Sequence, residues 1–114
     1  MKLNNQFQTP EWCCSYMASL IPRECQRILE PTPGDGNLVR AILKRNRPQP
    51  ELPYFYVWAP EKFEDIPDGS KFDCVVMNPP FANGQGLRIL EKCMTMSDYI
   101  IALMPWLNII NSCI

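Results

Sequence analysis

The chain has 114 residues, a formal net charge of −1 and an apolar content of 46%. This size and balance favour one soluble globular domain spanning residues 1–114. The near-neutral net charge argues against a chain that binds nucleic acid by electrostatic attraction alone. The longest apolar run, near residues 100–105, is too short to span a membrane, and no signal peptide is recognisable at the start. We therefore expect a cytoplasmic protein without membrane contacts.

Six cysteines and no histidine restrict the metal and disulfide chemistry of the chain. Cys13 and Cys14 are adjacent, and the remaining cysteines lie far apart without a C-x-x-C pair. Zinc sites in proteins usually combine cysteine and histidine at short, regular spacings. Because most of these cysteines fall in apolar runs, we expect reduced, mostly buried thiols and no metal site.

The first predicted element is a helix that begins after Thr9 and ends near residue 21. Threonine can cap a helix, and Pro10 suits its first position. Pro22 then stops the helix. Apolar residues at helical spacing predict one buried stripe, formed by Trp12, Cys13, Tyr16, Met17, Leu20 and Ile21.

Residues 27–30 predict a short strand, and the Pro- and Gly-rich residues 31–36 predict a tight turn. A second helix is predicted over residues 37–46, with an inner face of Leu38, Val39, Ile42 and Leu43. Cations near a helix C-terminus suit the helix dipole. We interpret one cationic cluster as a solvated surface at the end of the sheet opposite any site: Arg40, Lys44, Arg45 and Arg47.

Three further strands are predicted at residues 54–58, 72–77 and 99–104, with a helix after the 82–86 loop. Residues 72–77 are apolar on both faces except at Asp73, which is typical of a central parallel strand. The alternation of helices and strands predicts an α/β fold of Rossmann-like type, mostly parallel, with flanking helices and truncated after the strand near 99–104. Such sheets bind ligands at the carboxyl ends of their strands.

Two unusual loops fall at those strand ends. In the first, a strand ends in Glu30, and a turn containing Gly34 and Gly36 opens a helix. The glycines would let a ligand approach the backbone closely, and Glu30 could hold a polar or cationic group. The alternative is a simple strand-to-helix turn with an acid facing solvent.

The second loop is Asn78-Pro79-Pro80-Phe81. The prolines fix their own φ angles and stiffen the carbonyl positions. The carbonyl oxygens of the Asn78 side chain and of Pro79 could accept both hydrogens of a planar amino group, while Phe81 offers a face for stacking. The alternative is a strand stopped by two prolines, with Phe81 turned inward.

Together these loops resemble those of class I S-adenosylmethionine-dependent amino-methyltransferases, most closely the N6-adenine DNA methyltransferases. The glycine loop resembles that family's Asp/Glu-Pro-x-x-Gly-x-Gly, the second loop its catalytic Asn-Pro-Pro-Tyr/Phe, and residues 7–10 its early Thr-Pro motif. Residues 103–105, Leu-Met-Pro, also match. The resemblance covers nearly the whole chain in the family's order.

The resemblance implies transfer of a methyl group from S-adenosylmethionine to the N6 amino group of a flipped-out adenine in DNA. Catalysis would rest on alignment and electrostatics. The implied catalytic residues are Asn78, Pro79, Pro80 and Phe81. The implied cofactor-binding residues are Thr9, Glu30, Thr32, Gly34, Gly36 and Asn37.

The middle of the chain is short by comparison with the family. Only residues 48–71 separate the second helix from the next motif, which is too short for a strand, a crossover helix and another strand. One strand, at 54–58, then takes the place of two. Glu61 is our candidate for the acid that holds the cofactor ribose, and Asp65 for the acid at the adenine edge.

The resemblance and the short middle together indicate an adenine DNA methyltransferase of a short phage or mobile-element type, or a fragment of one. Two alternatives to this interpretation stay open. The same motif serves methyltransferases acting on protein glutamine amides or RNA guanine amines. The second alternative is a non-catalytic remnant that binds cofactor or a partner subunit. It is favoured because no target-recognition region follows the last predicted strand. The apolar residues at 106–114 would then form an edge that awaits a partner or a missing C-terminal region.

Overall fold

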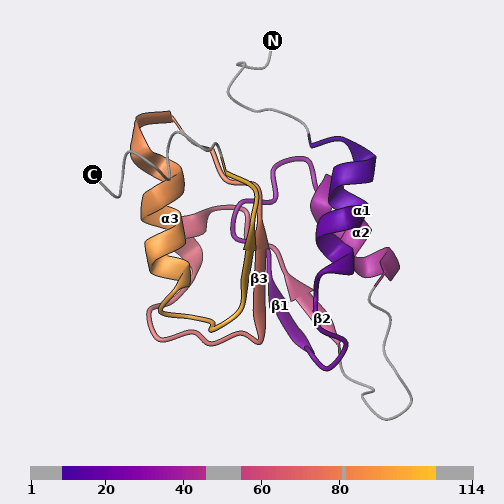
Figure 1. Ribbon diagram of the computed structural model, residues 1–114. Helices are drawn as coiled ribbons and strands as arrows, with labels where there is room; N and C mark the ends of the chain where they lie inside the picture. Colours follow the sequence, from indigo (N-terminus) through magenta and orange to yellow (C-terminus); the bar gives the residue numbers. More distant parts are fainter. Residues whose placement is uncertain (1–8, 46–54, 81, 105–114) are drawn as a thin grey trace.

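The computed structural model describes residues 9–45, 55–80 and 82–104. Over these ranges the chain alternates helices with strands, as Figure 1 shows. The elements in chain order are α1 (Glu11–Ser19), β1 (Arg27–Leu29), α2 (Asn37–Arg45), β2 (Tyr56–Trp58), the 3₁₀ turn η1 (Phe63–Asp65), β3 (Cys74–Met77), the 3₁₀ turn η2 (Ala82–Gly84), α3 (Gln85–Cys93) and β4 (Ile100–Ala102).

The described strands form one parallel sheet in the order β2-β1-β3-β4. From β1 the chain moves outward to β2 and then returns to β3 on the other side of β1. The strand order therefore reverses between β1 and β3. In open α/β sheets this reversal opens a crevice at the carboxyl ends of the two strands. The α/β class and the parallel sheet expected from the sequence are confirmed.

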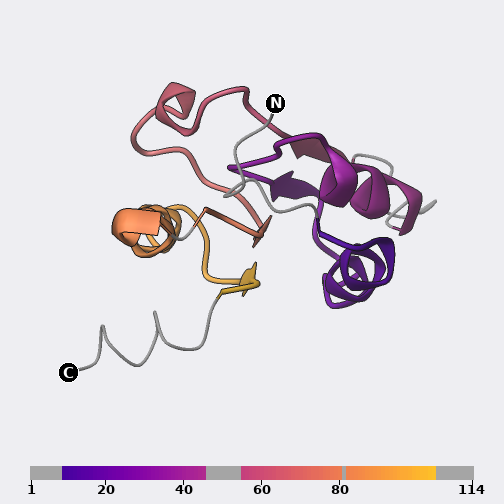
Figure 2. The same cartoon turned by 90° about the horizontal axis from the view of Figure 1, so that it is seen from above.

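Helices cover both faces of the sheet. Figures 1 and 2 show α1 and α2 on one side and α3 on the other. Buried residues of β1 and β3 alternate between the two layers, as a central parallel strand requires. Ile28, Cys74 and Val76 pack with α1 and α2, and Leu29, Val75 and Met77 pack with α3.

The connection from β2 to β3 is as short as the sequence indicated. Within the described residues it contains only the 3₁₀ turn η1 and no crossover helix. A parallel crossover needs about a dozen residues but not necessarily a helix, and residues 59–73 supply that length. The prediction that one strand takes the place of two is consistent with this topology.

The predicted inner stripe of α1 is partly wrong. Trp12 and Tyr16 are 74% and 61% exposed, whereas Cys14 and Ala18 are buried. The helix turns its small residues toward the sheet and α2, because small side chains let the backbones approach closely. Met17 is buried as expected. On α2, likewise, Leu38 and Ile42 are buried but Leu43 is half exposed.

The cysteines behave as expected in the described part of the chain. Those recorded there are free thiols, and four of them are buried: Cys13, Cys14, Cys74 and Cys93. Burial raises the pKa of the Cys74 and Cys93 thiols to about 12. Such thiols are neutral at physiological pH and behave as small apolar side chains. Cys113 lies outside the described residues.

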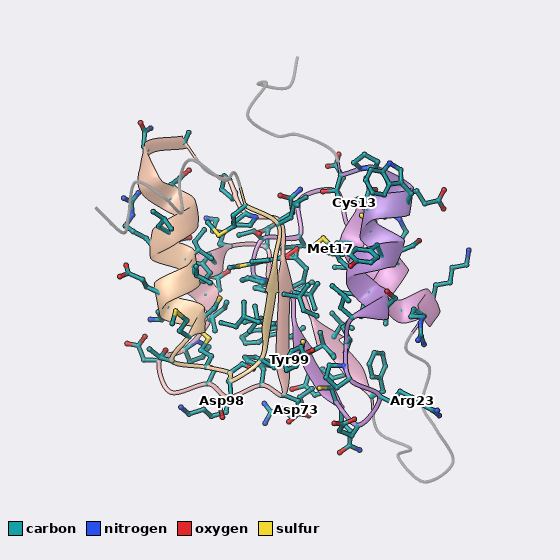
Figure 3. The ribbon with its side chains drawn as sticks, in the orientation of Figure 1. Cys13, Met17, Arg23, Asp73, Asp98 and Tyr99 are labelled. Atoms are coloured by element: carbon teal, nitrogen blue, oxygen red, sulfur yellow. The ribbon has the colours of Figure 1, made fainter. Side chains whose placement is uncertain are left out.

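Asp73, the polar residue of the β3 segment, ties β3 to β1 at their amino ends. Its Oδ2 accepts hydrogen bonds from the backbone N–H groups of Gln26 and Arg27, both at 2.9 Å. Figure 3 shows Asp73 at the end of the sheet opposite Cys13. The carboxylate therefore accepts hydrogen bonds from two backbone donors at the amino end of β1, at the end of the sheet opposite the carboxyl ends of the strands.

We expect Asp73→Ala to lower the free energy of unfolding by about 1–3 kcal/mol, because two backbone donors lose a charged acceptor. Asp73→Asn is the matched control, since its amide oxygen still accepts a hydrogen bond, and it should lose less. Urea denaturation followed by circular dichroism measures both. Equal losses in the two variants would contradict the role of the acceptor.

Candidate functional site

Glu30 follows β1 directly and is buried, at 2% exposure. Its backbone N–H donates to the Trp58 carbonyl at 2.9 Å, which extends the β1–β2 ladder by one residue. Its Oε1 accepts hydrogen bonds from the Thr32 N–H at 2.8 Å and the Thr32 hydroxyl at 3.5 Å. Burial raises the pKa of Glu30 to about 8, against the opposing effect of these two bonds.

The turn after Glu30 needs its glycines. The Gly36 N–H donates to the Pro33 carbonyl at 2.9 Å, and Gly34 and Gly36 have φ values of +54° and +87°. A Cβ at Gly36 would lie 3.1 Å from Arg40 Nη1, whereas one at Gly34 would meet no atom within 4 Å. The Gly34 backbone is therefore the part of this loop that a ligand can approach.

The second loop leaves β3 where the β3–β4 ladder ends. The Met77 carbonyl accepts the last ladder bond, from the Leu103 N–H at 3.0 Å. Asn78 follows at once and is half-buried, and Pro79 is fully buried. Pro80 is half-buried. Phe81 lies outside the described residues, so its stacking role stays a prediction.

Thr9 joins the early Thr-Pro motif to the second loop. The Asn78 amide nitrogen donates a hydrogen bond to the Thr9 hydroxyl, across 69 positions of sequence. Thr9 does not cap α1 as predicted, because Pro10 occupies the N-cap position and no side-chain cap bond forms. The threonine hydroxyl is directed to Asn78 instead of to its own helix. Because an amide carries its donor and acceptor on different atoms, this bond leaves the Asn78 oxygen free to face another group.

Arg40 lies at the site, which corrects its assignment to the far end of the sheet. Its Nη1 donates to the Asp35 carbonyl at 3.1 Å, and its Nη2 donates to the Asn37 side-chain oxygen. Burial, Cys13 and Glu30 raise the pKa of the Cys14 thiol, while Arg40 lowers it. The two hydrogen bonds hold the Arg40 guanidinium over the turn that precedes α2. The prediction failed because helical spacing alone cannot show that a long side chain folds back over the preceding turn.

The structure brings together most but not all of the predicted cofactor residues. Thr32, Gly34, Gly36 and Asn37 lie on the loop between Glu30 and α2. Glu61 follows β2 at the same end of the sheet but is exposed, and Asp65 is exposed on η1. In the part of the chain that the structure describes, no side-chain hydrogen bond or ion pair joins either acid to the other candidate residues. Their proposed roles stay predictions.

Arg88 is a residue that the sequence reasoning did not single out. It lies on α3, one turn after the loop that follows Pro80, and its Nη1 donates to the Asn83 carbonyl at 3.1 Å. Asn83 has a left-handed φ of +56°, and Gly84 follows with +73°. The available signal was a similarity between Asp35-Gly36-Asn37-Leu38-Val39-Arg40 and Asn83-Gly84-Gln85-Gly86-Leu87-Arg88.

Comparisons with family models, with curated proteins and with solved structures give no match to this chain. Over the described ranges, no cluster of three or more acidic, cysteine or histidine side chains is suited to hold a metal ion. No helix within the same ranges is long and apolar enough to cross a membrane. The fold and the contacts at the carboxyl ends of β1 and β3 are therefore the basis for any functional assignment.

Proposed function

We propose that the chain has a Rossmann-like methyltransferase fold and transfers a methyl group from S-adenosylmethionine to the N6 amino group of adenine in DNA. The observation that carries this proposal is the placement of the two predicted loops. Glu30 and Asn78 follow β1 and β3, the neighbouring strands between which the strand order reverses. Ligands of open α/β sheets bind at this point.

The chemistry assigned to the second loop needs fixed hydrogen-bond acceptors and no proton-transfer residue. Asn78 is held at its nitrogen by Thr9, and buried Pro79 fixes the next carbonyl. Two oxygens could then accept the two hydrogens of a planar amine and increase the negative charge on its nitrogen. Electrostatic preorganisation of this kind is usually the largest single contribution to the rate enhancement of an enzyme.

The residues at the first loop fit the proposed cofactor. S-adenosylmethionine supplies an electrophilic methyl group on a positively charged sulfur, and its amino-acid end carries an ammonium and a carboxylate. A cation next to a buried carboxyl stabilises its ionised form, which burial disfavours, and Glu30 is a carboxyl whose pKa is raised by burial. The open backbone at Gly34 gives room for the amino-acid end.

Calorimetric titration with S-adenosylmethionine, followed by a tritiated methyl-transfer assay, tests the proposal. We expect binding, and transfer to unmethylated adenine-containing DNA but not to the same DNA already methylated at N6. Transfer to RNA or to a glutamine peptide instead would move the substrate to one of the open alternatives. Binding without transfer to any of these would indicate a cofactor-binding module.

The Thr9–Asn78 bond predicts the effect of a conservative change. Thr9→Val keeps the side-chain shape but removes the hydroxyl, so the half-buried Asn78 N–H loses its partner. We expect kcat for methyl transfer to fall about tenfold, from a lost hydrogen bond of roughly 1–1.5 kcal/mol. Thr9→Ser keeps the hydroxyl and should stay near wild type. A Thr9→Val enzyme with unchanged kcat would show that this contact does not position Asn78.

A further inference from the structure

Two arginines occupy equivalent places on the two loops of the site. Arg40 lies four residues after Gly36, and its guanidinium donates to the Asp35 carbonyl, five residues before Arg40 in the chain. Arg88 lies four residues after Gly84 and donates to the carbonyl five residues before it, at Asn83, at the same distance of 3.1 Å. Both glycines have left-handed φ values. A backbone carbonyl thus fixes each guanidinium beside its own loop.

These two guanidiniums differ from most other basic groups in their position at the carboxyl ends of the central strands. Among the described residues, only Lys62 also follows the carboxyl end of a strand, and that strand is the outer one, β2. The remaining basic residues lie near the amino ends of strands, at the end of α2 or in an ion pair with Asp68: Arg23, Arg27, Lys71, Lys44, Arg45 and Lys92. Figure 3 shows Arg23 at the same end of the molecule as Asp73, away from the site.

The two arginines lie on helices that cover opposite faces of the sheet. Arg40 is on α2, and its guanidinium is bonded to the loop that follows Glu30, through the Asp35 carbonyl and the Asn37 side-chain oxygen. Arg88 is on α3, on the other face of the sheet, and its loop is the one that contains Asn78 and Pro79. Arg40 therefore belongs to the proposed cofactor side, and Arg88 to the side that would receive the amine.

We propose that Arg88 binds a phosphate of the substrate beside the amine held by Asn78, so that the substrate is a polynucleotide and not a glutamine side chain. The proposal rests on the methyl transfer proposed above. A guanidinium has five N–H donors in a planar fork, so the bond to Asn83 can fix its direction while other donors face an anion. Arginine is well matched to phosphate oxygens. A protein amide carries no such charge.

Fluorescence anisotropy with a labelled, adenine-containing oligonucleotide tests this without requiring methyl transfer. Over a series of salt concentrations, Arg88→Gln should weaken binding roughly tenfold at low salt and reduce the slope of log K against log salt by about 0.9, the value for one phosphate contact on duplex DNA. Replacing the phosphates around the target adenine by neutral methylphosphonates should remove the difference between wild type and Arg88→Gln.

Arg40→Gln is the matched control, because it removes from the other loop a guanidinium that likewise donates to a backbone carbonyl five residues earlier in the chain. It should leave the oligonucleotide salt slope unchanged. An Arg88→Gln protein that is folded by circular dichroism and keeps the wild-type affinity and salt slope would overturn the inference. If wild type binds DNA through Arg88 but transfers no methyl group, the inference stands and the proposed function fails. If the protein methylates DNA but Arg88→Gln does not change the salt slope, the proposed function stands and the inference about Arg88 fails.

Discussion

Asn78→Ala should lower kcat for methyl transfer by about 10²–10³, the usual effect of removing one preorganised polar group that acts on developing charge. The affinity for S-adenosylmethionine should change little, because the proposed cofactor loop is anchored by Glu30, Thr32 and Arg40 and not by Asn78. Single-turnover methyl transfer with tritiated cofactor measures the first quantity. Calorimetric titration measures the second.

Asn78→Asp is the matched control for this prediction. It retains an acceptor oxygen of the same reach, and the Thr9 hydroxyl can donate to a carboxylate as readily as it accepts from an amide. We expect Asn78→Asp to keep activity within about tenfold of wild type, well above Asn78→Ala. If Asn78→Ala transfers methyl groups at nearly the wild-type rate, the acceptor role of this loop is wrong.

The fold was largely accessible from the sequence because local patterns determine it. The apolar run ending at Met77 predicts a central strand buried on both faces, and β3 is such a strand. Proline and glycine at the strand ends predict where the two loops begin. The strand ends differ by one or two residues, as at Glu30, where a ladder bond continues past the end of β1.

The contacts within the site were less accessible, because they join residues far apart in sequence. Nothing local indicates that the Thr9 hydroxyl meets Asn78 instead of capping α1. The sequence groups Arg40 with the cations at the C-terminal end of α2, yet the length of its side chain lets it fold back over the glycine turn. On α1, similarly, the hydropathy of Trp12 predicts a buried side chain, but the helix buries its small residues instead, because they let it pack closely. Hydropathy patterns predict the burial of long and amphipathic side chains least well, because such side chains can bury one part and expose another.

Glu30 should make the stability of the fold depend on pH in the direction opposite to that of most acidic residues. Its pKa is raised to about 8 by burial, while the unfolded chain releases the same proton near its ordinary value. Between these two pKa values the unfolded state binds fewer protons, so stability falls as pH rises from about 5 to about 8. Ionisation of Glu30 therefore destabilises the ligand-free protein by an amount on the order of a few kcal/mol by pH 8.

Glu30→Gln isolates this effect, because glutamine keeps the acceptor for Thr32 but cannot ionise. The two proteins should melt at similar temperatures near pH 5, and the variant should melt about 10 °C higher at pH 8. Glu61→Gln, an exposed acid, corrects for the loss of one negative charge. A melting difference that does not change with pH would contradict the raised pKa. Because a cation beside Glu30 favours its ionised form, S-adenosylmethionine should raise the melting temperature of wild type at pH 7 more than that of Glu30→Gln.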